Sequence, residues 1–217
     1  MTAFSAITIR ISSMTIKLFL TSTEILPHQY EYLEKLAGKP LSEMSCGLIE
    51  NAADPYNDDS EDSFKLINRN AMADTKLKIT LVDLRSYTGN FSEFDMIWLG
   101  GGNTFYLRWL IEEKNFKNKI INFAYSGKIY AGGSAGAIIA GPDIEDADTV
   151  DDPNAAPYRI DNGLHITKYV VLPHVNNPDC AEEIGESAKR TLAKNLDLIE
   201  LEDGMIFIQQ DEHFDIL

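Results

Sequence analysis

Short apolar runs alternate along the chain with longer segments in which hydrophobic residues recur every three or four positions. The apolar runs are typical of buried strands, and the periodic segments are typical of helices that pack one face against a core. Strands are predicted at residues 16–20, 45–49, 78–84, 94–99, 129–131 and 166–172, with two more around the Asp203-Gly204 turn within 198–208. Helices are predicted at residues 25–37, 63–73, 104–113, 118–126 and 180–196.

Strands that alternate with helices predict an α/β fold, in which a mostly parallel sheet is covered by helices on both faces. The 217 residues contain no internal repeat, low-complexity tract or linker, so we expect a single domain over 1–217. Residues 1–13 are interpreted as an N-terminal extension, either an added edge strand or sequence upstream of a start at Met14. This segment lacks a basic region and has Arg10 within its apolar part, which argues against a signal peptide.

The stretch from Lys128 to Ala140 has the most informative local pattern. An apolar run leads into the sequence GGSAG at 132–136, and a run of small residues compatible with a helix follows it. A strand, a tight turn that carries a serine and then a helix are the layout of a nucleophile elbow. The pattern predicts Ser134 as a nucleophile and the N–H of Ala135 as a donor toward an oxyanion above the serine hydroxyl. The alternative is a glycine-rich turn that joins a buried strand to a helix.

Three polar clusters lie directly after predicted strands: GGGNT at 100–104, Ser134 and His174. Ligands of open α/β sheets bind beyond the carboxyl ends of the strands, so we expect these clusters to meet at one edge of the sheet. The glycine triplet lacks the remainder of a nucleotide-binding motif. We interpret it either as a tight strand-to-helix turn or as the source of a second oxyanion donor, the N–H of Gly101.

A nucleophilic serine needs a base, and the histidines of this chain are His28, His165, His174 and His213. His174 is favoured because it follows a predicted strand and precedes a polar loop, whereas a loop histidine bonded to backbone is the alternative. A carboxylate should orient the imidazole. The loop between Ser134 and His174 offers several carboxylates, and the spacing does not choose among them: Asp143, Glu145, Asp146, Asp148, Asp151, Asp152 and Asp161.

The formal net charge of −15 argues against nucleic acids and anionic membranes as partners, because both require clustered Lys and Arg. No apolar run approaches the length of a membrane span. Cys46 and Cys180 lie far apart without the spacing of a zinc site, which suggests neither a disulfide framework nor a metal site. This cysteine usage predicts a cytoplasmic protein.

Together, GGGNTFYL at 100–107, GGSAGAIIAGPDI at 132–144 and LPHVNN at 172–177 are far more specific than the serine motif alone. In sequence, order and spacing they resemble the S51 serine peptidases, the family of peptidase E and cyanophycinase. The alternation of elements extends the resemblance from about Met14 to near the C-terminus. It implies a flavodoxin-like sheet similar to that of class I glutamine amidotransferases.

The resemblance also implies roles for individual residues. Ser134 would be the nucleophile, His174 the base, and the N–H groups of Gly101 and Ala135 the oxyanion hole, with Asn103 beside the site. The acidic member would lie in the loop after the serine, where we favour Asp151 and keep Asp148 and Asp152 as alternatives. Aspartate-specific members carry an arginine in the helix after the histidine. Here that helix contains Lys189-Arg190, slightly displaced from the expected place, and Arg190 is the expected contact of a substrate carboxylate.

We therefore predict a serine peptidase that hydrolyses short peptides through a Ser-His-Asp triad and an acyl-enzyme, with a preference for an N-terminal aspartyl residue. The expected partner is a small peptide, with a homodimer allowed, and we expect neither a metal nor an organic cofactor. One alternative is an esterase-type hydrolase. The other is a catalytically silent protein of the same fold that binds a small molecule.

Overall fold

A computed structural model describes residues 15–56 and 63–217 of the chain. The predicted extension at 1–13 lies outside the described residues. The helices are α1 (Tyr30–Ala37), α2 (Phe64–Ala73), α3 (Thr104–Glu113), α4 (Lys117–Ala124), α5 (Ala135–Ile138) and α6 (Ala181–Ala193). Short 3-10 helices are Pro27–Gln29, Leu41–Glu43, Asn51–Tyr56 (η3), Glu145–Thr149 (η4), Pro153–Ala155 (η5) and Pro178–Cys180.

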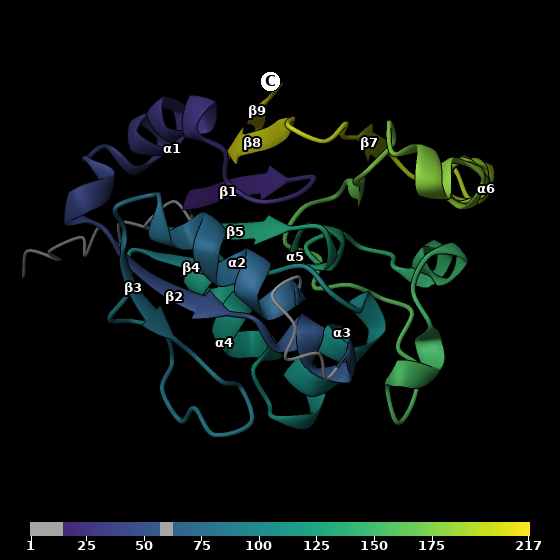
Figure 1. The fold of residues 1–217 in the computed structure, drawn as a ribbon, viewed down its shortest axis with the longest axis horizontal. Coiled ribbons are helices and arrows are strands. Elements are labelled where there is room, and N and C mark those ends of the chain that lie inside the picture. The colour runs from purple at the N-terminus through teal and green to yellow at the C-terminus, as the bar shows by residue number, and fades with distance from the viewer. Residues whose placement is uncertain (1–14, 57–62) are drawn as a thin grey trace, which may run out of the picture.

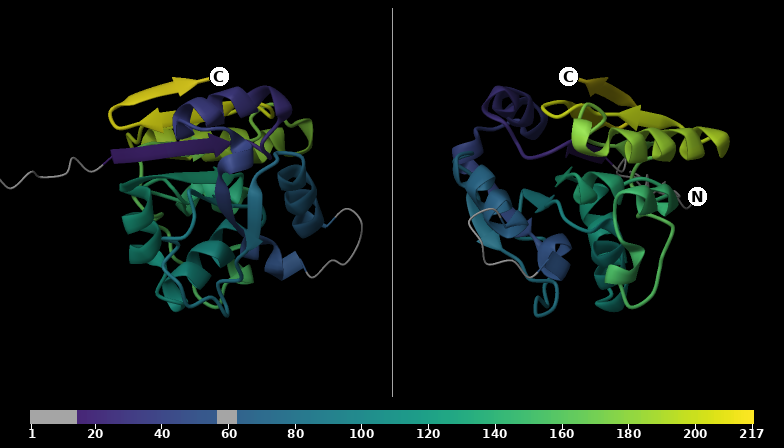
Figure 2. Two further views of the ribbon diagram at one scale, coloured as in Figure 1. Left: turned by 90° about the vertical axis from the view of Figure 1, so that its left-hand side faces the viewer. Right: turned by 45° about the vertical axis from the view of Figure 1, so that its right-hand side comes forward.

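A seven-stranded sheet with the order β3-β2-β4-β5-β1-β8-β9 forms the centre of the molecule (Figure 1). Its strands are β1 (Thr15–Thr21), β2 (Ser45–Ile49), β3 (Lys78–Leu81), β4 (Met96–Leu99), β5 (Ser126–Gly133), β8 (Ile206–Gln210) and β9 (His213–Ile216). The first five of these are parallel to one another, β8 pairs antiparallel with β1, and β9 pairs antiparallel with β8. Figure 2 shows these two strands stacked beyond β1 at one edge. The mostly parallel α/β fold predicted from the sequence is confirmed.

Apolar side chains on both faces of the strands make two cores, as expected for a sheet covered on both sides. In β1, Leu18 and Leu20 point into the core that contains side chains of α3, α4 and α5, whereas Phe19 points into the core that contains side chains of α1 and α2. This arrangement explains why the strand is a continuous apolar run and does not alternate with polar residues. Among the described residues, no helix has the length and apolarity needed to cross a membrane.

A separate two-stranded parallel sheet pairs β6 (Val170–Leu172) with β7 (Leu198–Glu200). The strand predicted at 166–172 is therefore wrong in its first half. The N–H groups of Ile166 and Thr167 both donate to the carbonyl of Ala140, just after α5, and cannot join a strand ladder there. The two strands predicted around the Asp203-Gly204 turn exist as β7 and β8, but they belong to different sheets.

Candidate active site

Ser134 lies between β5 and α5 with φ 49° and ψ −114°, a backbone conformation that is strained for any residue with a side chain. The flanking glycines make the turn possible. A Cβ on Gly132 would lie 2.5 Å from the carbonyl of Gly136, and a Cβ on Gly136 would collide with the backbone oxygen of Leu99. The close approach of strand and helix therefore requires glycine at both positions, and the turn presents the serine hydroxyl at the carboxyl end of β5.

The loops that end β4 and β5 bring Gly101 and Ala135 to the serine. A Cβ on Gly101 would lie 3.3 Å from the Ser134 Cβ, so the glycine backbone faces the serine directly. Ala135 is fully buried and is the first residue of α5, where N–H groups have no partner within the helix. The structure thus brings together the nucleophile and both of the residues predicted as oxyanion donors.

His174 follows β6 and contacts the serine: its Nε2 lies 3.1 Å from Ser134 Oγ. Its other ring nitrogen, Nδ1, lies 2.7 Å from Oδ1 of Asp203, a residue of the loop after β7. Because β6 and β7 are parallel neighbours, their carboxyl ends place the histidine and the aspartate side by side. The side chains of His174 and Asp203 are 25% and 37% exposed, so this contact is partly open to solvent.

A buried serine that sequence analysis missed supports this pair. Ser22, which follows β1, donates to Asp203 Oδ1 at 2.6 Å and accepts the backbone N–H of His174 at 2.8 Å. Asn176 adds a second anchor, since its Oδ1 accepts the backbone N–H of Asp203 at 2.8 Å. The sequence signal that could have found Ser22 is its place just after the strand predicted at 16–20, because polar residues at strand ends gather at the binding edge of an α/β sheet.

The structure places Asp151 away from the histidine position for which it was predicted. Its Oδ2 accepts the N–H of Thr104, the first residue of α3, at 2.8 Å, and Asp203 occupies the place beside His174 Nδ1. Burial raises the pKa of the Asp151 carboxyl, although the hydrogen bonds from Thr104 partly offset this effect. The assignment of Asp151 as the orienting acid is corrected here, because the loop that carries it packs over the start of α3.

The two alternative acids, Asp148 and Asp152, also contact groups other than His174. Asp148 pairs with Arg190 at 2.8 Å and with Arg159 at 2.9 Å, and Asp152 caps the short helix η5. Burial alone would raise the pKa of Asp148, but the hydrogen bonds from the two arginines outweigh it and lower the pKa.

Asn103, predicted beside the site, and Arg190, predicted to contact a substrate carboxylate, both have side-chain partners within the protein. The side chain of Asn103 caps α3 by accepting from Tyr106 N–H at 2.8 Å, and it donates to the Asp152 carbonyl at 2.9 Å. Arg190 is paired with Asp146 at 3.1 Å as well as with Asp148, so its guanidinium ties α6 to η4. Both side chains therefore have structural partners within the protein.

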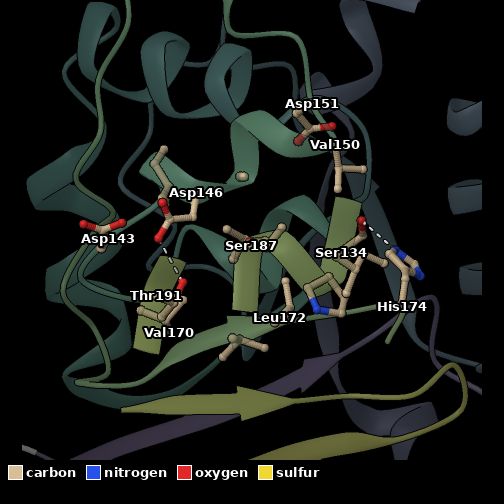
Figure 3. Close-up of a pocket in the computed structure, with 16 residues that line it drawn as sticks. Ser134, Asp143, Asp146, Val150, Asp151, Val170, Leu172, His174, Ser187 and Thr191 are labelled. Carbon is tan, nitrogen blue, oxygen red and sulfur yellow. Dashed lines mark hydrogen bonds between the residues drawn. The ribbon is translucent and has the colours of Figure 1, made fainter. Parts of the chain in front are cut away.

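A narrow cavity of about 50 Å³ extends from Ser134 and His174 between η4 and α6 (Figure 3). Its wall is mainly apolar, and none of the described residues that line it is a lysine or an arginine. Asp151 lies near the serine, whereas Asp143 and Asp146 gather at the opposite end, as Figure 3 shows. Among the described residues, no group of three or more His, Cys, Asp or Glu side chains is arranged to hold a metal ion.

The sequence of this chain is similar to those of known peptidases. The model of peptidase family S51 matches residues 20–217. An uncharacterized peptidase from Pasteurella multocida is 30% identical over 141 residues, which cover 63% of this chain and 67% of that protein. A peptidase E from Actinobacillus pleuropneumoniae is 30% identical over 172 residues, or 79% of this chain and 69% of that protein.

Solved structures show the same fold. A protein from Listeria monocytogenes EGD-e, described as a candidate peptidase E, superposes with a TM-score of 0.78 at 20% identity, covering 94% of this chain and 98% of that one. A peptidase from an acI-B1 Actinobacterium superposes with a TM-score of 0.68 at 17% identity, covering 94% of this chain and 88% of that one. With the family model matched from β1 to the C-terminus, the chain belongs to peptidase family S51.

Proposed function

We propose that this protein is a serine peptidase that cleaves short peptides through Ser134, His174 and Asp203. The observation that carries the proposal is the continuous chain of contacts from Ser134 Oγ to His174 Nε2 at 3.1 Å and from His174 Nδ1 to Asp203 at 2.7 Å. Nucleophile and base within hydrogen-bond reach, with the base oriented by a third group, are the arrangement that activates a serine hydroxyl.

In the proposed mechanism, His174 removes the hydroxyl proton as Ser134 attacks the carbonyl carbon of the scissile bond. The N–H groups of Gly101 and Ala135 stabilise the oxyanion of the tetrahedral intermediate, and one such donor typically contributes about 3 kcal/mol. His174 then protonates the departing amine, and water hydrolyses the acyl-enzyme. Asp203 keeps the imidazole in the productive orientation and stabilises the imidazolium that forms.

We do not propose the preference for an N-terminal aspartyl residue that the family resemblance implied. That preference required Arg190 to be free, and both Asp146 and Asp148 hold its guanidinium. The described wall of the cavity also lacks lysine and arginine, so a substrate carboxylate would enter an environment lined by Asp143, Asp146 and Asp151. We propose short peptides whose first side chain is uncharged.

The test is hydrolysis of a dipeptide panel by the wild-type protein and by Ser134→Ala, prepared so that contaminating peptidases are absent. A fluorophosphonate, which reacts with activated serines, should label Ser134 in the wild type and leave the variant unlabelled. Loss of dipeptide cleavage with an unchanged thermal unfolding midpoint is the expected result. Undiminished cleavage by Ser134→Ala would exclude the proposed nucleophile.

The two alternatives predict different results in the same experiment. Labelling of Ser134 and hydrolysis of p-nitrophenyl esters, without cleavage of any peptide, would favour an esterase-type hydrolase. Failure of the fluorophosphonate to label Ser134 would favour a catalytically silent binding protein.

A further inference from the structure

Strand β9 leaves one edge of the seven-stranded sheet unpaired. It pairs with β8 on one side, no described strand pairs with its other side, and Figure 2 shows it as the outermost strand at the top of both views. All four of its residues are exposed, including Phe214 at 42% and Ile216 at 39%. Soluble proteins usually protect such an edge with lysine, proline, a bulge or a covering loop. The sequence HFDIL at 213–217 contains neither lysine nor proline, so this edge is open to a further strand.

The hydrogen bonds to β8 identify which backbone groups of β9 face outward. At the end of the strand, the N–H and the C=O of Leu217 both bond to Ile206 of β8, at 3.0 and 2.8 Å. Residues of an antiparallel pair alternate between facing the partner strand and facing away from it. In the observed register, the N–H and C=O groups of Phe214 and Ile216 therefore face away from β8. They form a row of donors and acceptors along the free edge.

The side chains of β9 suit a second copy of the same strand. His213 and Asp215 lie on one face, and Phe214 lies on the other, where its ring centroid is 5.1 Å from that of Tyr169 and 5.5 Å from that of Phe207. Within 15–56 and 63–217, neither His213 nor Asp215 forms an ion pair. A base and an acid two positions apart are complementary to themselves in an antiparallel pair, because each meets the other across the strands.

The charges also choose between the two registers that the outward-facing groups favour. If Phe214 lies opposite Phe214 of the second copy, each His213 lies opposite an Asp215. If Phe214 lies opposite Ile216, the two Asp215 side chains lie opposite each other, and like charges in that position are destabilising. In the first register His213 and Asp215 form non-hydrogen-bonded pairs, in which opposed side chains are closest. Charge complementarity therefore favours the register centred on Phe214.

We propose that β9 is the interface of a homodimer, in which two copies pair β9 with β9 antiparallel about a two-fold axis at Phe214. The same patch serves both copies, so the assembly closes at two and joins their sheets into one. A short pair of edge strands is at the lower limit of interface size, and each chain carries a net charge of −15, so the dimer should dissociate in the micromolar range. The proposal does not rest on the peptidase function, because no residue of the proposed site lies in β9.

The first test is sedimentation equilibrium of the full chain at physiological ionic strength, at which exposed charges more than ~8 Å apart are largely screened. The wild type should show a monomer–dimer equilibrium. His213→Asp places two acids opposite each other twice in the dimer and should raise the dissociation constant roughly 10-fold. The double variant His213→Asp/Asp215→Lys restores opposite charges and should recover the dimer. Lys78→Asp on β3, the other edge strand, is the matched control: it changes the net charge by more and should leave the dissociation constant unchanged.

Disulfide cross-linking tests the register. Directly opposed hydrogen-bonded residues have Cα atoms about 5.5 Å apart, which a disulfide can bridge, whereas diagonal neighbours are about 7–8 Å apart and exceed its reach. Cys180→Ser removes the partly exposed native thiol, and Cys46 is buried. In that background, mild oxidation should join two copies of Phe214→Cys and should leave Asp215→Cys uncoupled.

The contrary outcomes are equally specific. A monomer at every concentration would overturn the proposal, and so would a dimer that His213→Asp leaves unchanged or that Lys78→Asp weakens to the same extent. Failure of the double variant to recover the dimer would exclude the charge pairs that select the register. Faster cross-linking of Asp215→Cys than of Phe214→Cys would exclude a two-fold axis at Phe214. Labelling of Ser134 by the fluorophosphonate tests the peptidase function separately from all of these results.

Discussion

Replacement of Asp203 by asparagine separates the charge of this residue from its geometry. Asp203 Oδ1 accepts from both His174 Nδ1 and the Ser22 hydroxyl, at 2.7 and 2.6 Å. Within the described part of the chain, Oδ2 makes no hydrogen bond. An asparagine can therefore keep its oxygen at the shared position and turn its amide toward the unused side. The imidazole tautomer that presents Nε2 to the serine should be retained in Asp203→Asn.

The expected loss is then the electrostatic stabilisation of the imidazolium. Two unit charges about 4 Å apart attract by about 1 kcal/mol in water and by about 4 kcal/mol at an effective dielectric constant of 20. The side chains of Asp203 and His174 are 37% and 25% exposed, so screening by solvent places the value between these limits. We expect about 2–3 kcal/mol, which corresponds to a roughly 30- to 150-fold decrease in kcat/KM. Asp203→Ala also removes the orienting acceptor and should approach the ~10⁴-fold loss seen for triad acids.

The assay is kcat/KM for one cleaved dipeptide, together with the rate of fluorophosphonate labelling, for both Asp203 variants. Glu202→Gln is the matched control, because it neutralises an exposed carboxylate next to the same turn. Near-normal activity of Asp203→Ala would exclude Asp203 as the orienting acid. A loss in Asp203→Asn as large as in Asp203→Ala would refute the argument that the tautomer is retained.

Three further predictions follow from the same contacts. Ser22→Ala leaves the backbone N–H of His174 without its acceptor and removes one of the two donors to Asp203 Oδ1, so urea unfolding should show a loss of about 1–3 kcal/mol and activity should fall. Full stability would contradict the contribution of these hydrogen bonds. Asp151→Asn removes a carboxyl whose pKa is raised in the folded state. Such a carboxyl destabilises the fold once the pH exceeds its pKa in the unfolded chain, about 3.9. The variant should therefore unfold at a higher temperature than the wild type at pH 7, and this difference should vanish as the pH falls below about 4. A lower unfolding midpoint of the variant at pH 7 would contradict the destabilising effect of the charged carboxylate. Arg190→Met should destabilise the protein by about 1–3 kcal/mol, a value reduced by the 34% exposure of the arginine. The relative rates of hydrolysis of dipeptides that begin with Asp, Asn or Leu should stay unchanged. A selective loss of activity on the dipeptide that begins with Asp would restore the predicted role of Arg190 in specificity.

The lowered pKa of Asp148 gives an opposite pH dependence. Its pairing with Arg190 and Arg159 contributes stability that is present above the unfolded pKa of about 3.9 and is lost as the pH falls through the lower folded value. The contacts that anchor η4 to α6 should therefore weaken in acid. Because Asp151 follows η4 closely in the chain, its position in the cavity depends on the same contacts.

The sequence alone predicted the serine turn, because the residues that form it are neighbours in the chain. The elbow at Ser134 needs an apolar strand, small residues where strand and helix touch, and glycine at 132 and 136, all of which occur within one short stretch. The position of His174 could also be predicted from the sequence, because a strand end followed by a polar loop is a local pattern. For the same reason, the parallel α/β fold followed from the alternation of strands and helices.

Tertiary structure alone decided which carboxylate meets the histidine. Asp203 is 29 residues beyond His174, in a turn that resembles an ordinary link between two tail strands, while Asp151 lies in the acidic loop where the acid was expected. The pairing of β6 with β7, which brings His174 and Asp203 together, joins two three-residue strands separated by α6. Such short strands carry little local preference of their own, so long-range packing sets their register. The partners of Asp151 and Arg190 depend on packing in the same way, because the sequence fixes the charge of a side chain and only the fold fixes the charge that faces it.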